Sequence, residues 1–308
     1  MATLSVIIPV YNGAKTLERA LASLPKNRSE IEVIAVDQAS SDNSRDILAD
    51  WATRLPIRVV DGAASKAWTT TTNLGFEAAS SPHLAMLHQD DAWAPDFLDA
   101  ALKSAETWPE ASLWLHGGAY VDDNDRAVGV FSPPFGAPAR LLPREEALNT
   151  LIVQNTTSLP SAIFRRDAAL AGGGLDPALW YTADWDLWLR LAKLGPVGWN
   201  PAKISNFRLH KGSQTMQGSR NAADFAEQLE EPLRRHGADC TNPERLALAK
   251  ASNRMNVALA STYHGERVKW GAILFSLVKL GPLGLILFLR YTRLPQRIWP
   301  RLRLRLGL

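Results

Sequence analysis

The first third of the chain alternates short β-branched runs with segments in which apolar residues recur at helical spacing. The runs Ser5–Pro9, Ile31–Val36, Ile57–Val60 and His83–Leu87 predict buried strands, and helices are expected between them. Strands that alternate with helices predict an α/β domain with a mostly parallel, Rossmann-like sheet and helices on both faces. A content of 46% hydrophobic residues is ordinary for a globular protein and excludes a disordered or collagen-like chain.

Carboxylates follow two of these expected strands. Asp37 ends the second strand, and Asp90 and Asp91 follow the fourth. Ligands of open α/β sheets bind beyond the carboxyl ends of the strands, so these acids predict a binding site there. The motifs G-x-G-x-x-G and G-x-x-x-x-G-K-[ST] are missing, which argues against dehydrogenases and P-loop enzymes. A nucleotide diphosphate would instead be held through Mn²⁺ or Mg²⁺, which prefer oxygen ligands.

After Ala111 the pattern loosens. The expected elements are a strand that ends at Asp122, a short strand at Ile163-Phe164 and a helix over Trp185–Leu194. The segment 224–260 has a helical pattern, with breaks expected at Pro232, Gly237 and Pro243. We therefore expect helices to follow the second half of the sheet.

The net charge of +3 hides an asymmetry along the chain. From Glu266 onward nine Lys and Arg residues stand against Glu266 alone, which gives this tail +8 and leaves −5 for residues 1–265. Apolar residues separate the cations of the tail, which favours a membrane surface over nucleic acid as its partner. The single Cys240 excludes an intramolecular disulfide framework and a cysteine-cluster zinc site. No signal-peptide pattern precedes the first strand, so a cytoplasmic location is expected.

The stretch Gly271–Leu289 is mostly apolar. As one helix it would extend about 28 Å, close to the ~30 Å hydrocarbon core of a bilayer. Lys279 near its middle and the Gly281-Pro282 pair argue against a single spanning helix. Two short helices in the membrane interface are the favoured interpretation, and a spanning or re-entrant segment and a buried core helix are the alternatives. The arginines after Arg290 would then meet anionic lipid headgroups.

Six motifs occur in order between Leu4 and Thr215: SVIIPVYNG, EVIAVDQASSDNS, NLG, LHQDDAW, ADWDLWLRLAKLG and RLHKGSQT. In this order they resemble family 2 glycosyltransferases, which have the GT-A fold and use nucleotide-sugar donors. The resemblance covers about two thirds of the chain. It implies a GT-A domain over residues 1–215, with a nucleotide-binding half at 1–111 and an acceptor half at 112–215. A helical extension at 216–265 and a membrane-associating tail at 266–308 would follow.

The resemblance also implies roles for residues at the nucleotide end. Pro9 and Tyr11 match the loop that lines the nucleoside pocket, and Asp37 matches the acid that accepts a hydrogen bond from the base. Asn73 matches the N-x-G helix that faces the pyrophosphate. The four threonines Thr69–Thr72 stand where the family often has charged residues, a departure that weakens the match of this helix.

The motif His88-Gln89-Asp90 matches the family's D-x-D, whose last acid binds the metal. Asp90 is therefore the expected ligand of Mn²⁺ or Mg²⁺. His88 replaces the first acid, and it is either a ligand or a structural residue. Asp91 would either contact the metal ligands without binding the metal itself or cap the following turn. His210 matches a late histidine that reaches back to the metal or the pyrophosphate.

Asp184 matches the family's catalytic acid. An acceptor hydroxyl is a poor nucleophile until a carboxylate within hydrogen-bond reach takes its proton, so Asp184 is the expected general base. Asp186 is the competing candidate. A helix that begins near Trp185 would place Asp184 at its N-cap. Trp185 and Asp186 are the candidate acceptor contacts.

These matches imply an inverting glycosyltransferase that moves one sugar per encounter, because no Q-x-x-R-W motif of polymerising synthases is present. The expected donor is linked to UDP or dTDP, with GDP as an alternative. The expected acceptor is a hydroxyl of a lipid-linked or membrane-proximal glycan in cell-envelope polysaccharide biosynthesis, at the inner face of the cell membrane. A degenerate nucleotide-binding scaffold on the same fold is the alternative function, and nucleic acid is not an expected partner.

Overall fold

The computed structural model describes residues 2–65, 67–210, 212 and 218–306, arranged around a ten-stranded mixed sheet. Its strands are β1 (Leu4–Val10), β2 (Ile31–Asp37), β3 (Ile57–Asp61), β4 (His83–Met86), β5 (Ala92–Trp93), β6 (Leu113–Val121), β7 (Ala127–Phe131), β8 (Arg140–Leu142), β9 (Ala162–Arg165) and β10 (Val197–Arg208). Their order in the sheet is β3-β2-β1-β4-β9-β6-β10-β5, with β7 beside β6 and β8 beside β10.

The N-terminal half of the sheet is parallel, since β1 pairs with β2 and β4, and β2 pairs with β3. Strand β9 runs antiparallel to its neighbours β4 and β6, and β6 and β10 are again parallel. The short strands β5, β7 and β8 add antiparallel pairs. The expected α/β class is confirmed. Apart from β5, its antiparallel additions come from the part of the chain where the sequence pattern loosens.

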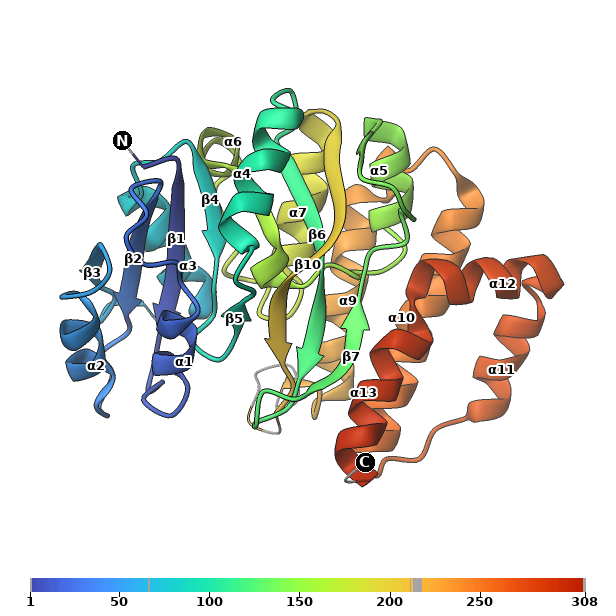
Figure 1. Cartoon of the computed structure of the whole chain (residues 1–308). Coiled ribbons are helices and arrows are strands. Elements are labelled where there is room, and N and C mark those ends of the chain that lie inside the picture. The colour runs from blue at the N-terminus through green and yellow to red at the C-terminus, as the bar shows by residue number, and fades with distance from the viewer. Residues whose placement is uncertain (1, 66, 211, 213–217, 307–308) are drawn as a thin grey trace.

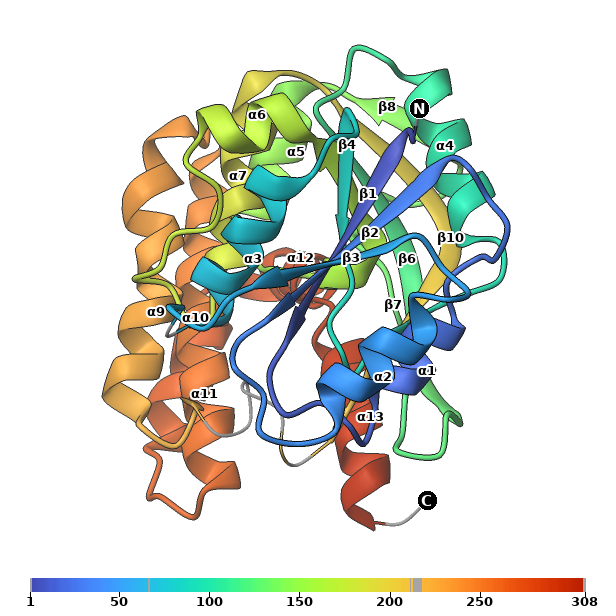
Figure 2. The same cartoon turned by 90° about the vertical axis from the view of Figure 1, so that its left-hand side faces the viewer.

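Helices cover both faces of the sheet (Figure 2). The described α-helices are α1 (Leu17–Ala22), α2 (Ser44–Trp51), α3 (Trp68–Ala78), α4 (Phe97–Thr107), α5 (Arg144–Leu151), α6 (Arg166–Ala171), α7 (Ala183–Leu194), α9 (Ala222–His236), α10 (Pro243–Tyr263), α11 (Trp270–Val278), α12 (Gly281–Thr292) and α13 (Leu294–Leu306). Helices α1, α2 and α4 share one hydrophobic cluster with the sheet, and α3, α5, α6 and α7 share the other.

Strand β1 shows why two clusters form. Successive side chains of a strand point to opposite faces, so Val6 and Ile8 enter one cluster while Ile7 enters the other. On the Ile7 face helix α3 lies very close, because a Cβ added at Gly75 would come within 2.3 Å of the Ile7 Cγ2. The glycine of the N-x-G motif is thus required for this close contact between helix and sheet.

The predicted break at Pro232 is wrong, because Pro232 lies inside α9, which ends at His236. A proline removes the N–H that would bind the carbonyl four residues earlier. That carbonyl, of Gln228, instead accepts a hydrogen bond of 3.0 Å from the Thr182 hydroxyl. The breaks at Gly237 and Pro243 are confirmed: the short 3₁₀ turn η2 (Gly237–Asp239) follows α9, and α10 begins at Pro243.

The C-terminal helices pack along one side of the domain (Figure 1). Helices α11 and α12 are separated at the expected Gly281-Pro282 break and are bent by 110° relative to one another. No single described helix is long and apolar enough to cross a membrane; the bent pair α11 and α12 meets the length and composition test only together. Leu277 and Phe288 of this pair are buried against the domain, whereas Phe275 and Ile286 are 61% and 63% exposed.

Helix α13 does not continue away from the domain. Its Pro300 packs on Gly129 of β7, and Leu304 contacts the cluster that contains Phe131. The Arg297 guanidinium donates to the Asn256 Oδ1 of α10 at 2.8 Å. The expectation that the arginines beyond Arg290 all face lipid is therefore wrong for Arg297, because α13 folds back over β7 and α10.

Candidate active site

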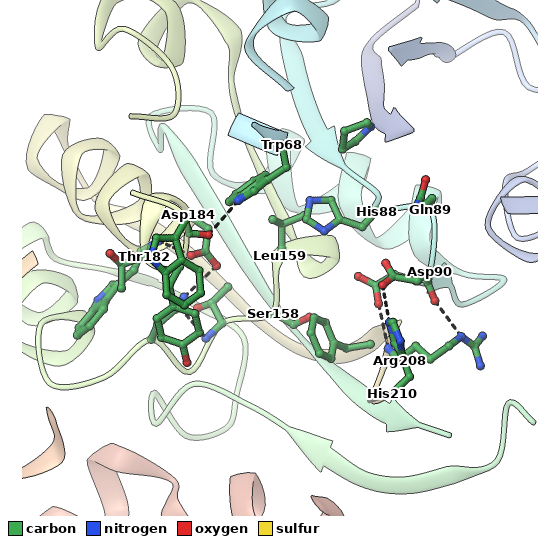
Figure 3. Close-up of a pocket in the computed structure, with 18 of the residues that line it drawn as sticks. Trp68, His88, Gln89, Asp90, Ser158, Leu159, Thr182, Asp184, Arg208 and His210 are labelled. Atoms are coloured by element: carbon green, nitrogen blue, oxygen red, sulfur yellow. Dashed lines mark hydrogen bonds and ion pairs between the residues drawn. The ribbon is translucent and has the colours of Figure 1, made fainter. Parts of the chain in front are cut away.

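A cavity of about 600 Å³ opens at the carboxyl ends of β1, β4 and β10. Its walls also include the start of α3, the loop over residues 154–159 and the first turn of α7. Figure 3 shows Asp90 with His210 on one side and Asp184 on the other, with His88 and Leu159 between them. The volume lies within the usual range for sites that bind small molecules.

Gln89 joins the loop after β4 to the loop after β1. Its side-chain amide accepts a hydrogen bond from the Tyr11 N–H at 2.9 Å and donates to the Tyr11 carbonyl at 3.0 Å. Pro9 and Tyr11 line the cavity, as the sequence predicts for a nucleoside pocket, and the Tyr11 side chain is 56% exposed. Tyr11 therefore has a fixed backbone and a ring that remains accessible.

Arg208, at the end of β10, anchors the two acids that follow β4. Its backbone N–H donates to the Asp91 Oδ1 at 2.9 Å, and its Nε donates to the Asp90 carbonyl at 2.9 Å. The rest of the buried guanidinium binds the Asp122 carbonyl and the Asp125 carboxylate. This residue ties the β4 and β10 ends together, so the side chain two residues further on, His210, can reach Asp90.

A cluster of metal-ligand type lies at this end of the cavity. Ligand atoms of His88, Asp90 and Asp91 all lie within 4.8 Å of one another. The His210 Nε2 is 2.8 Å from the Asp90 Oδ2. The His88 Nε2 and the Asp91 Oδ2 are buried and have no hydrogen-bond partner in the described part of the chain. Buried polar atoms are normally paired, so the two unpaired atoms fit a group that would complete their contacts.

The charges of the cluster act on one another. Burial opposes the charged form of Asp90, but the His210 hydrogen bond and the charges of both histidines outweigh it and lower the pKa of Asp90. Burial and the Asp90 charge raise the pKa of Asp91. The Asp90 hydrogen bond raises the pKa of His210, while burial lowers that of His88. Asp90 is thus the acid held in its anionic form.

Asp184 faces the cavity from the opposite wall. Helix α7 begins at Ala183, so Asp184 lies in its first turn, and Thr182, not Asp184, is the N-cap. The helix starts earlier than predicted because the Asp186 N–H already binds the Thr182 carbonyl at 2.9 Å. The Asn155 amide donates to the Asp184 Oδ2 at 2.9 Å. Burial raises the pKa of Asp184 to about 6, although this hydrogen bond favours the anion.

Asp186 points elsewhere. Its carboxylate is 2.8 Å from the Arg190 Nε and 2.9 Å from the His236 Nε2, and it does not line the cavity in the described structure. Residues two positions apart on a helix point about 200° apart around its axis, so Asp184 and Asp186 face different neighbours. Trp185 lines the cavity, but it is 1% exposed and its Nε1–H binds the Leu151 carbonyl. The Asp186 carboxylate is thus held by Arg190 and His236 and is not among the described residues that line the cavity, which favours Asp184 over Asp186 as the base.

Asp37 and Asn73 are not among the described residues that line the cavity. Asp37 is 1% exposed and forms an ion pair with the Arg45 Nε at 2.5 Å, while its neighbour Gln38 lines the cavity. The Asn73 amide donates to the Leu175 carbonyl and accepts from the Leu175 N–H, both at 2.8 Å. We therefore interpret Asn73 as a residue that holds α3 against the segment before α7, in place of the predicted pyrophosphate contact.

Several cavity residues have no signal in the local sequence: Trp68, Asn155, Tyr181, Arg297 and Arg301. The polar run of residues 154–158 before a short 3₁₀ turn is the one feature that could have indicated the loop beside Asp184. The motif RLHKGSQT is described at Arg208–His210 and Gly212; its Lys211, Ser213, Gln214 and Thr215 lie outside the described residues.

Comparisons with known proteins show the family to which the chain belongs. The model of "Glycosyl transferase family 2" matches residues 5–169, more than half of the chain. The chain is 28% identical over 224 residues to an uncharacterized glycosyltransferase of Nostoc sp., covering 70% of this chain and 67% of the relative. It is 26% identical to the amylovoran biosynthesis glycosyltransferase AmsE of Erwinia amylovora over 66% of this chain and 75% of the relative.

Two solved structures share the fold. The mannosyltransferase PcManGT of Pyrobaculum calidifontis, in complex with GDP-Man and Mn²⁺, has a TM-score of 0.57 and 17% identity, covering 97% of this chain and 86% of that one. S. aureus TarS 1–349, in complex with UDP-GlcNAc, has a TM-score of 0.59 and 17% identity, covering 83% and 81%. With the family match, the sheet order and the cavity at the strand ends, the chain belongs to glycosyltransferase family 2 and is a nucleotide-sugar glycosyltransferase of the GT-A fold.

Proposed function

We propose that this enzyme transfers one sugar, with inversion at the anomeric carbon, from a nucleotide-sugar to an acceptor hydroxyl. The observation that carries the proposal is the placement of two carboxylates on opposite walls of one cavity. Asp90 is held as an anion beside His210, and Asp184 has a pKa raised to about 6. Two acids whose environments push their pKa values apart are suited to different roles.

The donor nucleotide would occupy the end of the cavity near Tyr11 and Gln38. The exposed Tyr11 ring offers a surface on which a base can stack. The similar structures hold UDP-GlcNAc and GDP-Man, which supports a UDP-, dTDP- or GDP-linked donor. Asp37 would contribute to the base site, provided that its ion pair with Arg45 opens.

The diphosphate would lie beside the cluster of His88, Asp90, Asp91 and His210. These residues fit Mn²⁺ or Mg²⁺, because the unpaired His88 Nε2 and Asp91 Oδ2 are available and Asp90 is anionic. Asp90 and His210 would hold the ion, and His88 or Asp91 would complete its contacts. When bound, such an ion neutralises negative charge on a departing diphosphate.

Asp184 would act as general base. Its carboxylate takes the proton of the acceptor hydroxyl while that oxygen bonds to the anomeric carbon, and the bond from this carbon to the diphosphate oxygen breaks with its electron pair. The Asn155 amide and the Trp185 N–H hold the two carboxylate oxygens at 2.9 and 2.8 Å. These hydrogen bonds fix the direction of the base, which a direct displacement requires.

The proposed acceptor is a lipid-linked or membrane-proximal glycan, and the proposed location is the inner face of the cell membrane. The support is the apolar surface of α11 and α12, on which Phe275, Val278, Leu283 and Ile286 are each more than 60% exposed. Lys269 and Arg290 flank these residues and Lys279 lies among them, a combination of apolar and basic residues typical of helices that lie in a membrane interface. The similarity to a glycosyltransferase of amylovoran biosynthesis supports a role in polysaccharide biosynthesis.

Asp184→Asn is expected to lower the transfer rate by roughly 10²–10⁴-fold, because the amide cannot accept the hydroxyl proton. Nucleotide affinity in the presence of Mn²⁺ should stay within about twofold of wild type, since Asp184 lies opposite the metal-ligand cluster. The measurement is turnover of nucleotide-sugar by product-release assay, with nucleotide binding by calorimetry. Asp186→Asn is the matched control and should keep its rate; equal losses in both variants would contradict the assignment.

Removal of divalent ions with EDTA is expected to stop turnover, and Mn²⁺ or Mg²⁺ should restore it. Asp90→Asn should need at least about tenfold more Mn²⁺ for half-maximal rate, because it removes the anionic oxygen ligand. The measurement is the initial rate as a function of Mn²⁺ concentration. Asp123→Asn, an exposed acid of the β6–β7 turn, is the control and should follow the wild-type curve. Full activity of the demetallated enzyme would rule out the metal.

The double variant Phe275→Glu/Ile286→Glu is expected to lose binding to anionic lipid vesicles, since it places two charges on the apolar face of α11 and α12. Leu194→Glu, at a 64% exposed residue of α7, is the control and should sediment with vesicles as wild type does. These substitutions test the membrane face more specifically than deletion of residues 266–308, because the deletion would also remove Arg297 and Arg301 from the cavity wall. Undiminished sedimentation of the double variant would refute the membrane face.

A further inference from the structure

The last helix of the chain contributes to the wall of the active-site cavity. Arg297 and Arg301 of α13 both line this cavity, together with Asp184 and Tyr181. They lie four residues apart, which places them on one face of the helix. Figure 1 shows α13 running beside α10 and β7, and the residues that line the cavity place Arg297 and Arg301 on its cavity side.

The position of Arg297 is fixed by a polar network. Its Nη2 donates to the Asn256 Oδ1 at 2.8 Å, and the Asn256 amide donates to the Gln154 Oε1, also at 2.8 Å. Ser252 donates to the same Gln154 oxygen at 2.7 Å. Gln154 precedes Asn155, the residue that binds Asp184. The network thus connects α13 through α10 to the loop that orients the base.

The two guanidiniums carry charge that no acid of the described structure neutralises. Other arginines around the site form ion pairs, such as Arg208 with Asp125 and Arg190 with Asp186. In the part of the chain that the structure describes, no carboxylate lies within ion-pair distance of Arg297 or Arg301. Burial and the neighbouring Arg301 charge lower the pKa of Arg297. Like charges four residues apart on a helix repel each other, so an anion between them would stabilise this arrangement.

Arg297 and Arg301 lie on the same side of the cavity as Asp184, the proposed general base. Burial raises the pKa of the Tyr181 hydroxyl; the charges of Arg297 and Arg301 oppose this rise, and the Asp184 charge adds to it. The charges of Arg297, Arg301 and Asp184 therefore all act on Tyr181, which lines the cavity with them. The Arg301 guanidinium also lies 5.9 Å from the centre of the Tyr120 ring. The donor diphosphate belongs to the opposite side, beside Asp90 and His210.

We propose that Arg297 and Arg301 bind a phosphate group carried by the acceptor, next to the hydroxyl that Asp184 activates. This inference rests on the proposed function of Asp184 and assigns a chemical class to the acceptor. Guanidiniums bind phosphate oxygens through charge-assisted hydrogen bonds, often two at a time. The phosphate belongs either to a lipid headgroup, whose hydrocarbon would follow the exposed face of α11 and α12, or to a soluble sugar phosphate.

The test is equilibrium binding with the donor end already filled by UDP or GDP and Mn²⁺. Three probes are titrated by calorimetry: octyl phosphate, glucose 1-phosphate and, as a neutral control, octyl glucoside. The variant is Arg297→Gln/Arg301→Gln, and the matched control is Arg267→Gln/Arg305→Gln, which removes two exposed arginines of the same tail that do not line the cavity. Arg301→Gln alone, at an exposed side chain, is the second variant should the double variant unfold.

The expected result is saturable binding of at least one phosphate probe to wild type, weakened by at least about tenfold in the double variant and unchanged in the control. Tighter binding of octyl phosphate identifies a lipid source, and tighter binding of glucose 1-phosphate identifies a soluble one. Equal phosphate affinity in both double variants, or equal affinity of wild type for octyl glucoside, would overturn the inference. A loss of nucleotide affinity in place of phosphate affinity would also overturn it. Failure of wild type to bind nucleotide would overturn the proposed function instead.

Discussion

The buried guanidinium of Arg208 joins two strand ends on which the donor side of the site depends. Its backbone N–H binds Asp91 and its Nε binds the Asp90 carbonyl, so the loop after β4 cannot move independently of β10. His210 follows on the same strand end and reaches the Asp90 carboxylate at 2.8 Å. Without this connection the cluster of His88, Asp90 and Asp91 would be three residues of a surface loop.

The two carboxylates that line the cavity, Asp90 and Asp184, lie in different electrostatic environments. On the β4 side the hydrogen bond from His210 holds Asp90 in its anionic form, which suits a ligand for a cation. On the α7 side burial makes the anion of Asp184 less favourable, so its carboxylate is a stronger base than an exposed one. The difference arises from protein packing, because the two residues have the same side chain. Both carboxylates line one cavity of about 600 Å³, a volume within the usual range for sites that bind small molecules.

The part of the fold that could be predicted from sequence is the part with local signals. The end of β2 at Asp37 and the end of β4 shortly before Asp90 follow from short apolar runs, and the break at Gly281-Pro282 follows from backbone chemistry. The motif that resembles the family predicts Asp184, but α7 begins before it because the Asp186 N–H binds the Thr182 carbonyl. The break predicted at Pro232 is wrong because α9 continues through it. The Gln228 carbonyl that Pro232 leaves unpaired binds the Thr182 hydroxyl, 46 residues away in sequence.

Residues brought to the site by long-range packing could not be predicted. Asn155 reaches Asp184 from a loop 29 residues earlier, and nothing in its neighbourhood indicates that partner. The charge and spacing of Arg297 and Arg301 are equally typical of a membrane-facing helix. Their position in the cavity depends on α13 folding back over Gly129 and Asn256. Conversely, Asn73 matched a motif, yet its amide is committed to Leu175.

The central claim, that a desolvated Asp184 is the general base, is tested most directly by the pH dependence of kcat/KM between pH 4.5 and 8. A base must be deprotonated, and the pKa of Asp184 is raised to about 6. The rate should therefore be constant above about pH 7 and should fall by about tenfold per pH unit well below 6. The residual rate of Asp184→Asn should lack this break. A wild-type profile that stays flat down to pH 5 would contradict the account.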